Sequence, residues 1–89
     1  MKQAENVDDL LSGDCLVVTA ISTSIYSCVN GKATRPKFIY EDDTVIFLHA
    51  YPTEGDEPGN TPFWCKIFFK GDVYLESKHC ITGSYKKVQ

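Results

Sequence analysis

The sequence predicts an all-β protein, a small twisted β-barrel of five or six strands. Three apolar runs in the second half carry this prediction: TVIFLHAY (44–51), FWCKIFFK (63–70) and VYLESKHCI (73–81). They are rich in the aromatic and β-branched residues that fit a pleated, half-buried surface. Tight turns and one long polar loop (52–62) separate them, which is typical of consecutive strands of one small sheet.

The first half predicts one strand and a long arm. Residues 6–13 can form a short helical turn, with Asn6 as N-cap and Gly13 at its end. The β-branched run 15–22 is expected to be a strand. Asn30-Gly31 is a strong hairpin signal, while Pro36 limits the returning strand, so we expect an irregular surface hairpin between them.

The run 63–70 alternates between two faces. Phe63, Cys65, Ile67 and Phe69 form one set, which we expect in the core, and Trp64 opens the other. A turn at Gly71-Asp72 follows. Residues 77–80 are too short for an ordinary helix and suit one 3₁₀ turn, and residues 81–85 are expected to form a last short strand.

Length and composition indicate one domain spanning residues 1–89, with residues 1–13 as the N-terminal helical turn and 86–89 as a frayed tail. No apolar run approaches the ~18 residues that span a bilayer. The N-terminus also lacks the apolar stretch of a secretory signal. We therefore expect a cytoplasmic protein with no membrane partner.

Charge is unevenly distributed along the chain, whose net charge is −3. That total argues against a general nucleic-acid binder. The segment 41–57 contains only acidic charges, whereas lysines dominate 66–87. Solvated turns explain this pattern most simply, but a molecule with an acidic and a basic rim is the sharper interpretation. The acidic residues of that segment are Glu41, Asp42, Asp43, Glu54, Asp56 and Glu57.

No motif indicates catalysis or a cofactor. The cysteines, Cys15, Cys28, Cys65 and Cys80, show no CxxC spacing, so we expect reduced thiols in place of disulfides or zinc. His79 and Cys80 are adjacent, but neighbouring side chains on a strand point to opposite faces, so we expect no nucleophile–base pair there. The other histidine, His49, has no spacing that suggests a metal site. We expect no enzyme, no metal and no cofactor.

The order of elements from about residue 15 to residue 84 resembles the Src-homology-3-like small barrel. Trp64 stands where that family places its groove tryptophan, and VYLESKHC (73–80) resembles the family's Gly-Tyr-Ile-Pro-Ser-Asn-Tyr-Val run. The groove proline, asparagine and tyrosine of the family correspond to Glu76, Lys78 and His79 here. The resemblance therefore implies the barrel with an altered binding face.

Surface recognition is the function that remains. We expect a non-enzymatic protein-binding module, a stand-alone regulator or inhibitor of the kind found among phage or bacterial accessory proteins. Aromatic anchors ringed by charges are typical of interfaces, and the partner is another protein or a second copy of the chain. The predicted partner face comprises Tyr51, Trp64, Lys66, Phe68, Lys70, Lys78 and His79, with Glu54, Asp56 and Glu57 as a secondary charged rim.

Two alternatives stay open. Trp64, Phe68 and the lysines between them can stack bases and hold phosphates, which predicts a single-stranded nucleic-acid binder. An oligomeric nucleotide- or small-ligand-binding protein is the other alternative, with a pocket between subunits near Arg35, Trp64 and His79.

Overall fold

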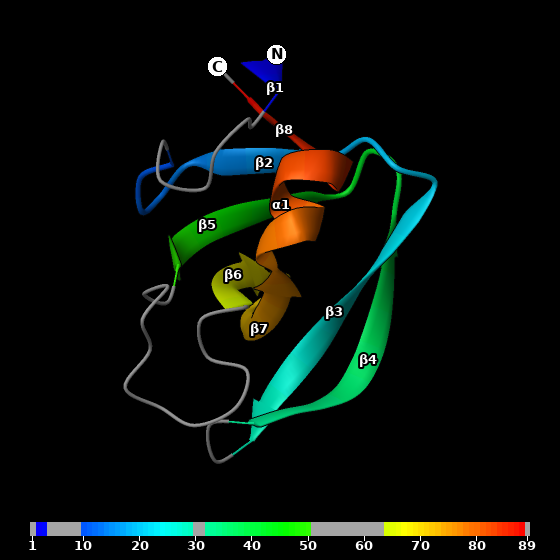
Figure 1. Cartoon of the computed structure of the whole chain (residues 1–89), viewed down its shortest axis with the longest axis vertical. Coiled ribbons are helices and arrows are strands. Elements are labelled where there is room, and N and C mark those ends of the chain that lie inside the picture. The colour runs from blue at the N-terminus through cyan, green and yellow to red at the C-terminus, as the bar shows by residue number, and fades with distance from the viewer. Residues whose placement is uncertain (1, 4–9, 30–31, 51–63, 89) are drawn as a thin grey trace.

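The computed structural model describes residues 2–3, 10–29, 32–50 and 64–88, which form eight β-strands and one α-helix (Figure 1). The strands are β1 (Lys2–Gln3), β2 (Cys15–Val18), β3 (Ser22–Val29), β4 (Lys32–Tyr40), β5 (Thr44–Ala50), β6 (Trp64–Phe69), β7 (Asp72–Ser77) and β8 (Tyr85–Lys87), and the helix is α1 (Lys78–Ser84).

All eight strands join one antiparallel sheet in the order β1-β8-β2-β5-β6-β7-β3-β4. The all-β prediction is confirmed. The strand count differs from the five or six expected, because the arm forms two long strands and the chain ends contribute β1 and β8. The sheet curls, and the β3–β4 hairpin runs along one side of the molecule, at the right in Figure 1, with α1 to its left.

One hydrophobic core holds the curled sheet together. Cys65, Ile67 and Phe69 are buried in it, as their alternation in the sequence predicts, while Phe63 lies outside the described residues. Burying side chains of this size contributes about 1.5–3 kcal/mol each. The other members of the core are Leu10, Leu16, Val18, Ile25, Ile39, Val45, Phe47, Ile81 and Tyr85.

The turn between β6 and β7 is made by Lys70 and Gly71, with Phe69 paired to Asp72 across it. Both turn residues have positive φ, 46° and 90°. Such a pair of angles is characteristic of the type I′ turns that match the twist of a hairpin. The predicted Gly71-Asp72 turn is therefore wrong by one residue, because Asp72 already belongs to β7.

The segment after β7 is an α-helix, so both the predicted 3₁₀ turn at 77–80 and the predicted strand at 81–85 are wrong. Ser77 caps the helix, since its hydroxyl accepts a 3.2 Å hydrogen bond from the Cys80 amide. Ile81 anchors the helix from within the core. An N-cap and one buried anchor suffice for two turns held by tertiary packing.

The two chain ends pair instead of fraying. Lys86 and Lys87 are paired with β2 and with β1, so the predicted frayed tail is wrong at these residues. Lys87 also forms a 3.4 Å ion pair with Asp14. Lys2 and Gln3 are extended in β1, which contradicts a helical turn there, and residues 4–9 lie outside the described residues. No helix within the described ranges has the length and apolarity needed to cross a bilayer.

Candidate functional site

A groove of about 430 Å³ lies between β3 and α1, and we call it the β3–α1 groove. Ser22 and Ser24 line it from the strand, and Ser77, Cys80 and Ser84 line it from the helix side. The walls are thus made mainly of small polar side chains.

The groove forms because β7 pairs with only a short part of β3 in the described chain. Tyr26 pairs with Leu75 and Ser27 with Tyr74, and these are the pairs between the two strands in the described chain. After Ser77 the chain turns into α1, since Ser77 has extended backbone angles and caps the helix. In the described chain, the part of β3 that precedes Tyr26 is therefore left without a strand on the side that faces α1.

Hydrogen bonds at the far end of the hairpin show which backbone groups of β3 face the groove. The Tyr40 amide donates to the Asp43 carboxylate at 2.9 Å, although Tyr40 is paired with Ser22 in the register. The Glu41 amide donates to the Ile21 carbonyl. Backbone groups alternate in direction along an antiparallel pair. Ser22 and Ser24 consequently point their amides and carbonyls away from β4, toward the β3–α1 groove.

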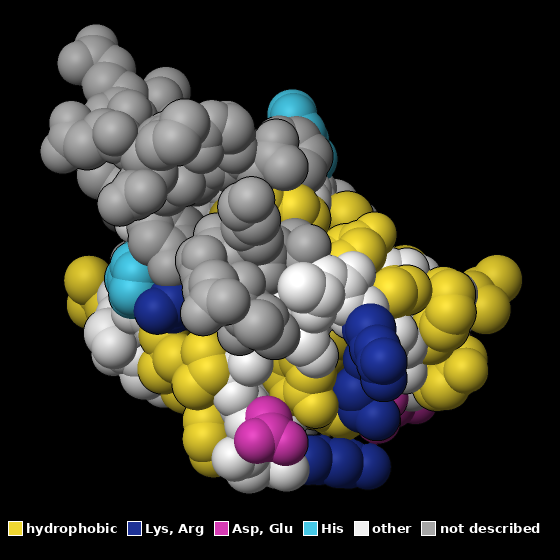
Figure 2. All heavy atoms as spheres, turned by 90° about the horizontal axis from the view of Figure 1, so that it is seen from below, with side chains coloured by type: hydrophobic (Ala, Val, Ile, Leu, Met, Phe, Trp, Pro, Cys, Tyr) yellow, Lys and Arg dark blue, Asp and Glu magenta, His cyan; other side chains and the backbone are white. Residues whose placement is uncertain are grey.

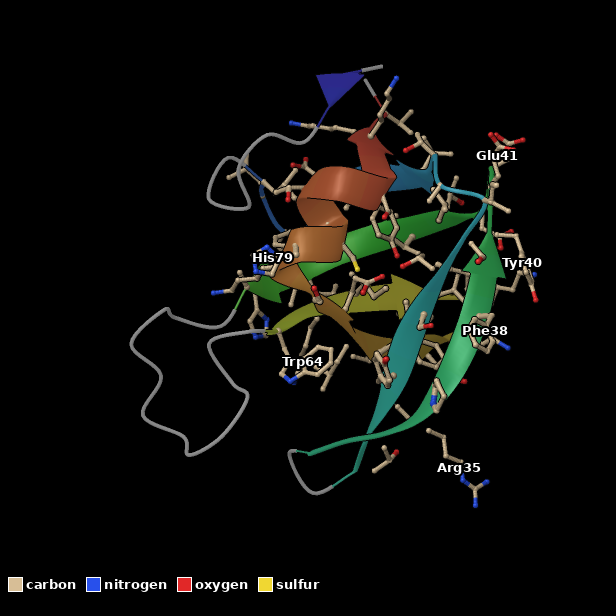
Figure 3. The ribbon with its side chains drawn as sticks, turned by 45° about the vertical axis from the view of Figure 1, so that its right-hand side comes forward. Arg35, Phe38, Tyr40, Glu41, Trp64 and His79 are labelled. Carbon is tan, nitrogen blue, oxygen red and sulfur yellow. The ribbon has the colours of Figure 1, made fainter. Side chains whose placement is uncertain are left out.

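Two aromatic rings close one end of the groove. Trp64 and Tyr26 pack edge to face, with ring centroids 5.3 Å apart and planes at 67°. Trp64 sits at the start of β6 (Figure 3). Tyr26 comes from β3, so the contact ties the arm to the rest of the sheet. Aromatic pairs of this geometry contribute about 0.5–1.5 kcal/mol beyond their burial.

A buried carboxyl group lies directly beneath the groove. Glu76 is fully buried, and its Oε2 accepts hydrogen bonds from the Tyr85 hydroxyl at 2.8 Å and from the Thr23 hydroxyl at 3.1 Å. Its Oε1 accepts from the Ser77 amide at 2.8 Å. The carboxyl group thereby joins β3, β7 and the start of β8 at the floor of the groove.

Burial shifts the protonation of this cluster. It raises the pKa of the Glu76 carboxyl above its ordinary value, and the hydrogen bonds from Tyr85, Ser77 and Thr23 only partly oppose that effect. Burial and the neighbouring Glu76 raise the pKa of the Cys80 thiol as well. A raised thiol pKa disfavours the thiolate of Cys80, which is the reactive species.

The partner face predicted from the sequence included neither Glu76 nor Tyr26, although the family resemblance had named Glu76 as an altered groove position. The register of the β6–β7 hairpin was the available signal for Glu76, because a two-residue turn at Lys70-Gly71 places Glu76 opposite the core residue Cys65. Directly opposed residues share one face of a sheet. No comparable signal identified Tyr26, whose contact with Trp64 depends on the path of the arm.

The predicted partner face is brought together only in part. Trp64, Lys66 and Phe68 share the outer face of β6, with Phe68 exposed. Lys70 lies in the following turn, with its ammonium 5.3 Å from the centre of the Phe69 ring. Lys78 and His79 stand in the first turn of α1, and His79 points to the side away from β3 (Figure 3). The remaining predicted residues, Tyr51, Glu54, Asp56 and Glu57, lie outside the described residues.

A second exposed surface runs along β4. Phe38 and Tyr40 are 58% and 59% exposed, and they project away from the groove (Figure 3). Figure 2 shows hydrophobic side chains gathered on this side of the molecule, next to lysine or arginine side chains. Arg35 lies at the lower end of the arm, far from Trp64 and His79, so these three residues do not converge within one chain (Figure 3).

The cysteines and histidines form no cluster of chemical interest in the described segments. Cys15, Cys65 and Cys80 carry free thiols, whereas the side chain of Cys28 lies outside the description. His79 and Cys80 both lie in α1. No group of three or more potential metal ligands occurs among the described residues.

No protein-family model, curated protein or solved structure matches this chain.

Proposed function

We propose that this chain is a non-enzymatic protein-binding module that recognises a segment of its partner in the β3–α1 groove. By binding that segment, the chain makes it inaccessible to other molecules and so regulates the partner. We also propose that the curled sheet is a small barrel related to the Src-homology-3-like type, with α1 in the place of the family's 3₁₀ turn.

The observation that carries the proposal is the Trp64–Tyr26 pair at the end of an open groove. A half-buried tryptophan held by a tyrosine offers a large, pre-ordered contact surface. Tryptophan and tyrosine are enriched among the residues that dominate interface energies. The groove volume, about 430 Å³, is within the range of pockets that hold side chains or small ligands.

The lining of the groove also bears on the kind of ligand. Recognition of a polyproline helix needs several stacked aromatic rings. Here the wall opposite β3 presents Ser77, Cys80 and Ser84, and Glu76 is buried beneath it. The ligand we propose is therefore not a polyproline helix.

Quantitative affinity capture from the protein's own cells tests this function. The bait is compared as wild type, as Trp64→Ala and as Phe38→Ala, which removes an exposed aromatic ring from the opposite side of the molecule (Figure 3). We expect wild type and Phe38→Ala to recover the same partners in similar amounts. Trp64→Ala should recover at least about tenfold less of them. Equal recovery with all three baits would show that the groove is not the binding site.

The nucleic-acid alternative rests on the shared outer face of Trp64, Lys66 and Phe68. The same face holds Ile46 and Val73 beside Phe68, which neither stack on bases nor contact phosphates. A titration with single-stranded oligonucleotides at low salt tests this alternative, since binding of this kind weakens steeply as salt is added. Tight, salt-sensitive binding would favour it over the protein-binding proposal.

A further inference from the structure

We infer that the partner segment binds as an added β-strand, hydrogen-bonded to the edge of β3 that lies open in the β3–α1 groove. The inference rests on the proposed function, and it names the class of ligand: a short extended stretch of polypeptide, recognised mainly through its backbone. Main-chain pairing of this kind is an established mode of peptide recognition on sheet edges.

The backbone of β3 supplies the first part of the argument. Ser22 and Ser24 direct one amide and one carbonyl each toward the groove, because the Tyr40 amide bonds to Asp43 and not to β3. Among the described residues, β7 pairs with β3 only at Tyr26 and Ser27. The open stretch from Ser22 to Ser24 is about 7 Å long, which matches the pairing of an extended segment of about three residues.

The opposite edge of the sheet supplies the second part. At β4, Pro36 has no amide, and the Tyr40 amide and carbonyl both bond to Asp43. Proline and capped backbone groups are devices that prevent unwanted strand pairing at edges. The outer edge of the hairpin is thus blunted at Pro36 and Tyr40, on either side of Phe38, whereas the edge of β3 in the groove keeps its donors and acceptors.

The walls of the groove supply the third part. Cys80 and Ser84 are four residues apart and lie on one face of α1, and Ser77 precedes them at the helix cap. Small side chains here and at Ser22 and Ser24 leave room for a peptide backbone to approach β3 closely. The Trp64–Tyr26 pair limits the groove at the end where β7 begins to pair with β3.

The test starts from a random dodecapeptide library displayed on phage and selected against the wild-type protein. The strongest peptide is synthesised, and its affinity is measured for wild type, Ser24→Pro and Ser24→Ala. Proline removes only an amide that faces the groove, and the neighbouring strand already accommodates Pro36 at a position of the same orientation. Thermal denaturation of each variant checks that the fold is kept.

We expect Ser24→Pro to bind at least about tenfold more weakly than wild type, and Ser24→Ala to bind within about threefold of it, since alanine keeps the amide. The peptide is also N-methylated one residue at a time. Methylation at every second residue should weaken the affinity at least about tenfold, and methylation at the residues between them should not. The reason is that the amides of a strand point alternately to its two sides. This second measurement needs no variant protein.

Three results would overturn strand addition: selection yields no binding peptide, Ser24→Pro binds as tightly as wild type, or N-methylation shows no alternation. The Trp64→Ala variant separates this failure from failure of the proposed function. If Trp64→Ala loses the peptide and Ser24→Pro does not, the groove is the binding site but the ligand is not a strand. If neither loses it, the proposed site itself is wrong.

Discussion

The hydroxyl of Tyr85 donates a 2.8 Å hydrogen bond to the Oε2 atom of Glu76, and both side chains are fully buried. Tyr85 opens β8 and Glu76 lies near the end of β7, so the bond connects the two strands that flank α1. Thr23 of β3 donates to the same oxygen. The floor of the β3–α1 groove is therefore held by one carboxyl group that several elements share.

Tyr85→Phe tests the contribution of this bond. The variant keeps the ring in the core but removes the donor, which leaves a buried carboxyl group with one partner fewer. We expect the free energy of unfolding to fall by about 1–3 kcal/mol, as is typical when a buried acceptor loses a partner. Urea denaturation measures it, and Tyr40→Phe, at an exposed tyrosine, serves as the control. Equal stability of Tyr85→Phe and wild type would contradict the role of the bond.

The raised pKa of Glu76 predicts a dependence of stability on pH. In the unfolded chain the carboxyl group has an ordinary pKa of about 4.5, whereas burial raises the pKa in the folded protein. As pH rises through 4.5, the unfolded chain releases this proton while the folded chain retains it. The contribution of Glu76 to the free energy of unfolding is therefore largest below the unfolded pKa and falls as pH rises toward the folded pKa.

Comparison with Glu76→Gln isolates this contribution from other titrating groups. Glutamine does not ionise, but its amide nitrogen faces either the Ser77 amide or the donors from Thr23 and Tyr85, so we expect destabilisation at all pH values. The difference in unfolding free energy between wild type and Glu76→Gln should shrink as the pH rises from about 4 to about 8, because the wild type loses stability between the unfolded and the folded pKa of Glu76. A constant difference would mean that Glu76 ionises alike in both states.

The thiol of Cys65 is predicted to be unreactive in the folded protein. Burial raises its pKa to about 12, and its side chain is inaccessible to solvent. Because the thiolate is the nucleophile, iodoacetamide at neutral pH should leave Cys65 unmodified until the chain is denatured. Peptide mass spectrometry after labelling in native buffer and in urea measures this. Rapid native labelling of Cys65 would contradict its place in the core.

The Lys70-Gly71 turn predicts a stabilising substitution. Lys70 has a φ of 46°, a conformation that costs ordinary residues about 1–2 kcal/mol and costs glycine little. Lys70→Gly should raise the free energy of unfolding by about 0.5–1 kcal/mol, since the loss of the ammonium–ring contact with Phe69 offsets part of the gain. Thermal and urea denaturation measure the change.

Gly71→Ala is the matched variant in the same turn. The φ of Gly71 is 90°, and no atom lies within 4 Å of the position of an added Cβ. Any loss of stability thus comes from the backbone alone, and we expect a decrease of about 1 kcal/mol or more. Stabilisation by Gly71→Ala, or destabilisation by Lys70→Gly, would contradict the turn geometry.

The sequence predicted the β-strands well where a period of two was visible. Cys65, Ile67 and Phe69 alternate with polar or exposed neighbours, and all three are in the core. It failed after Ser77, where seven residues without helical periodicity form α1. The helix depends on the Ser77 cap and on burial of Ile81, and the second of these comes from tertiary packing that no local pattern reveals.

The candidate site was predictable only at one residue. Trp64 was singled out from its place at the start of an alternating run, and it lies at the end of the groove. The other features of the groove come from pairing between distant segments. Thr23 and Glu76 are 53 residues apart, and the open backbone of Ser22 and Ser24 follows from where β7 stops pairing with β3. Such relationships depend on the register and end of each strand, which residue types do not specify.

Amide hydrogen exchange of β3 in the unbound protein, followed by NMR, is the most direct test of the central claim that this strand keeps an open edge in the groove. We predict that the amides of Thr23 and Ile25, which face β4, are protected at least about a hundredfold more than those of Ser22 and Ser24. The alternation needs no ligand and no variant. Equal protection at all four amides, or protection at Ser22 and Ser24 alone, would contradict the open edge and the mode of recognition built on it.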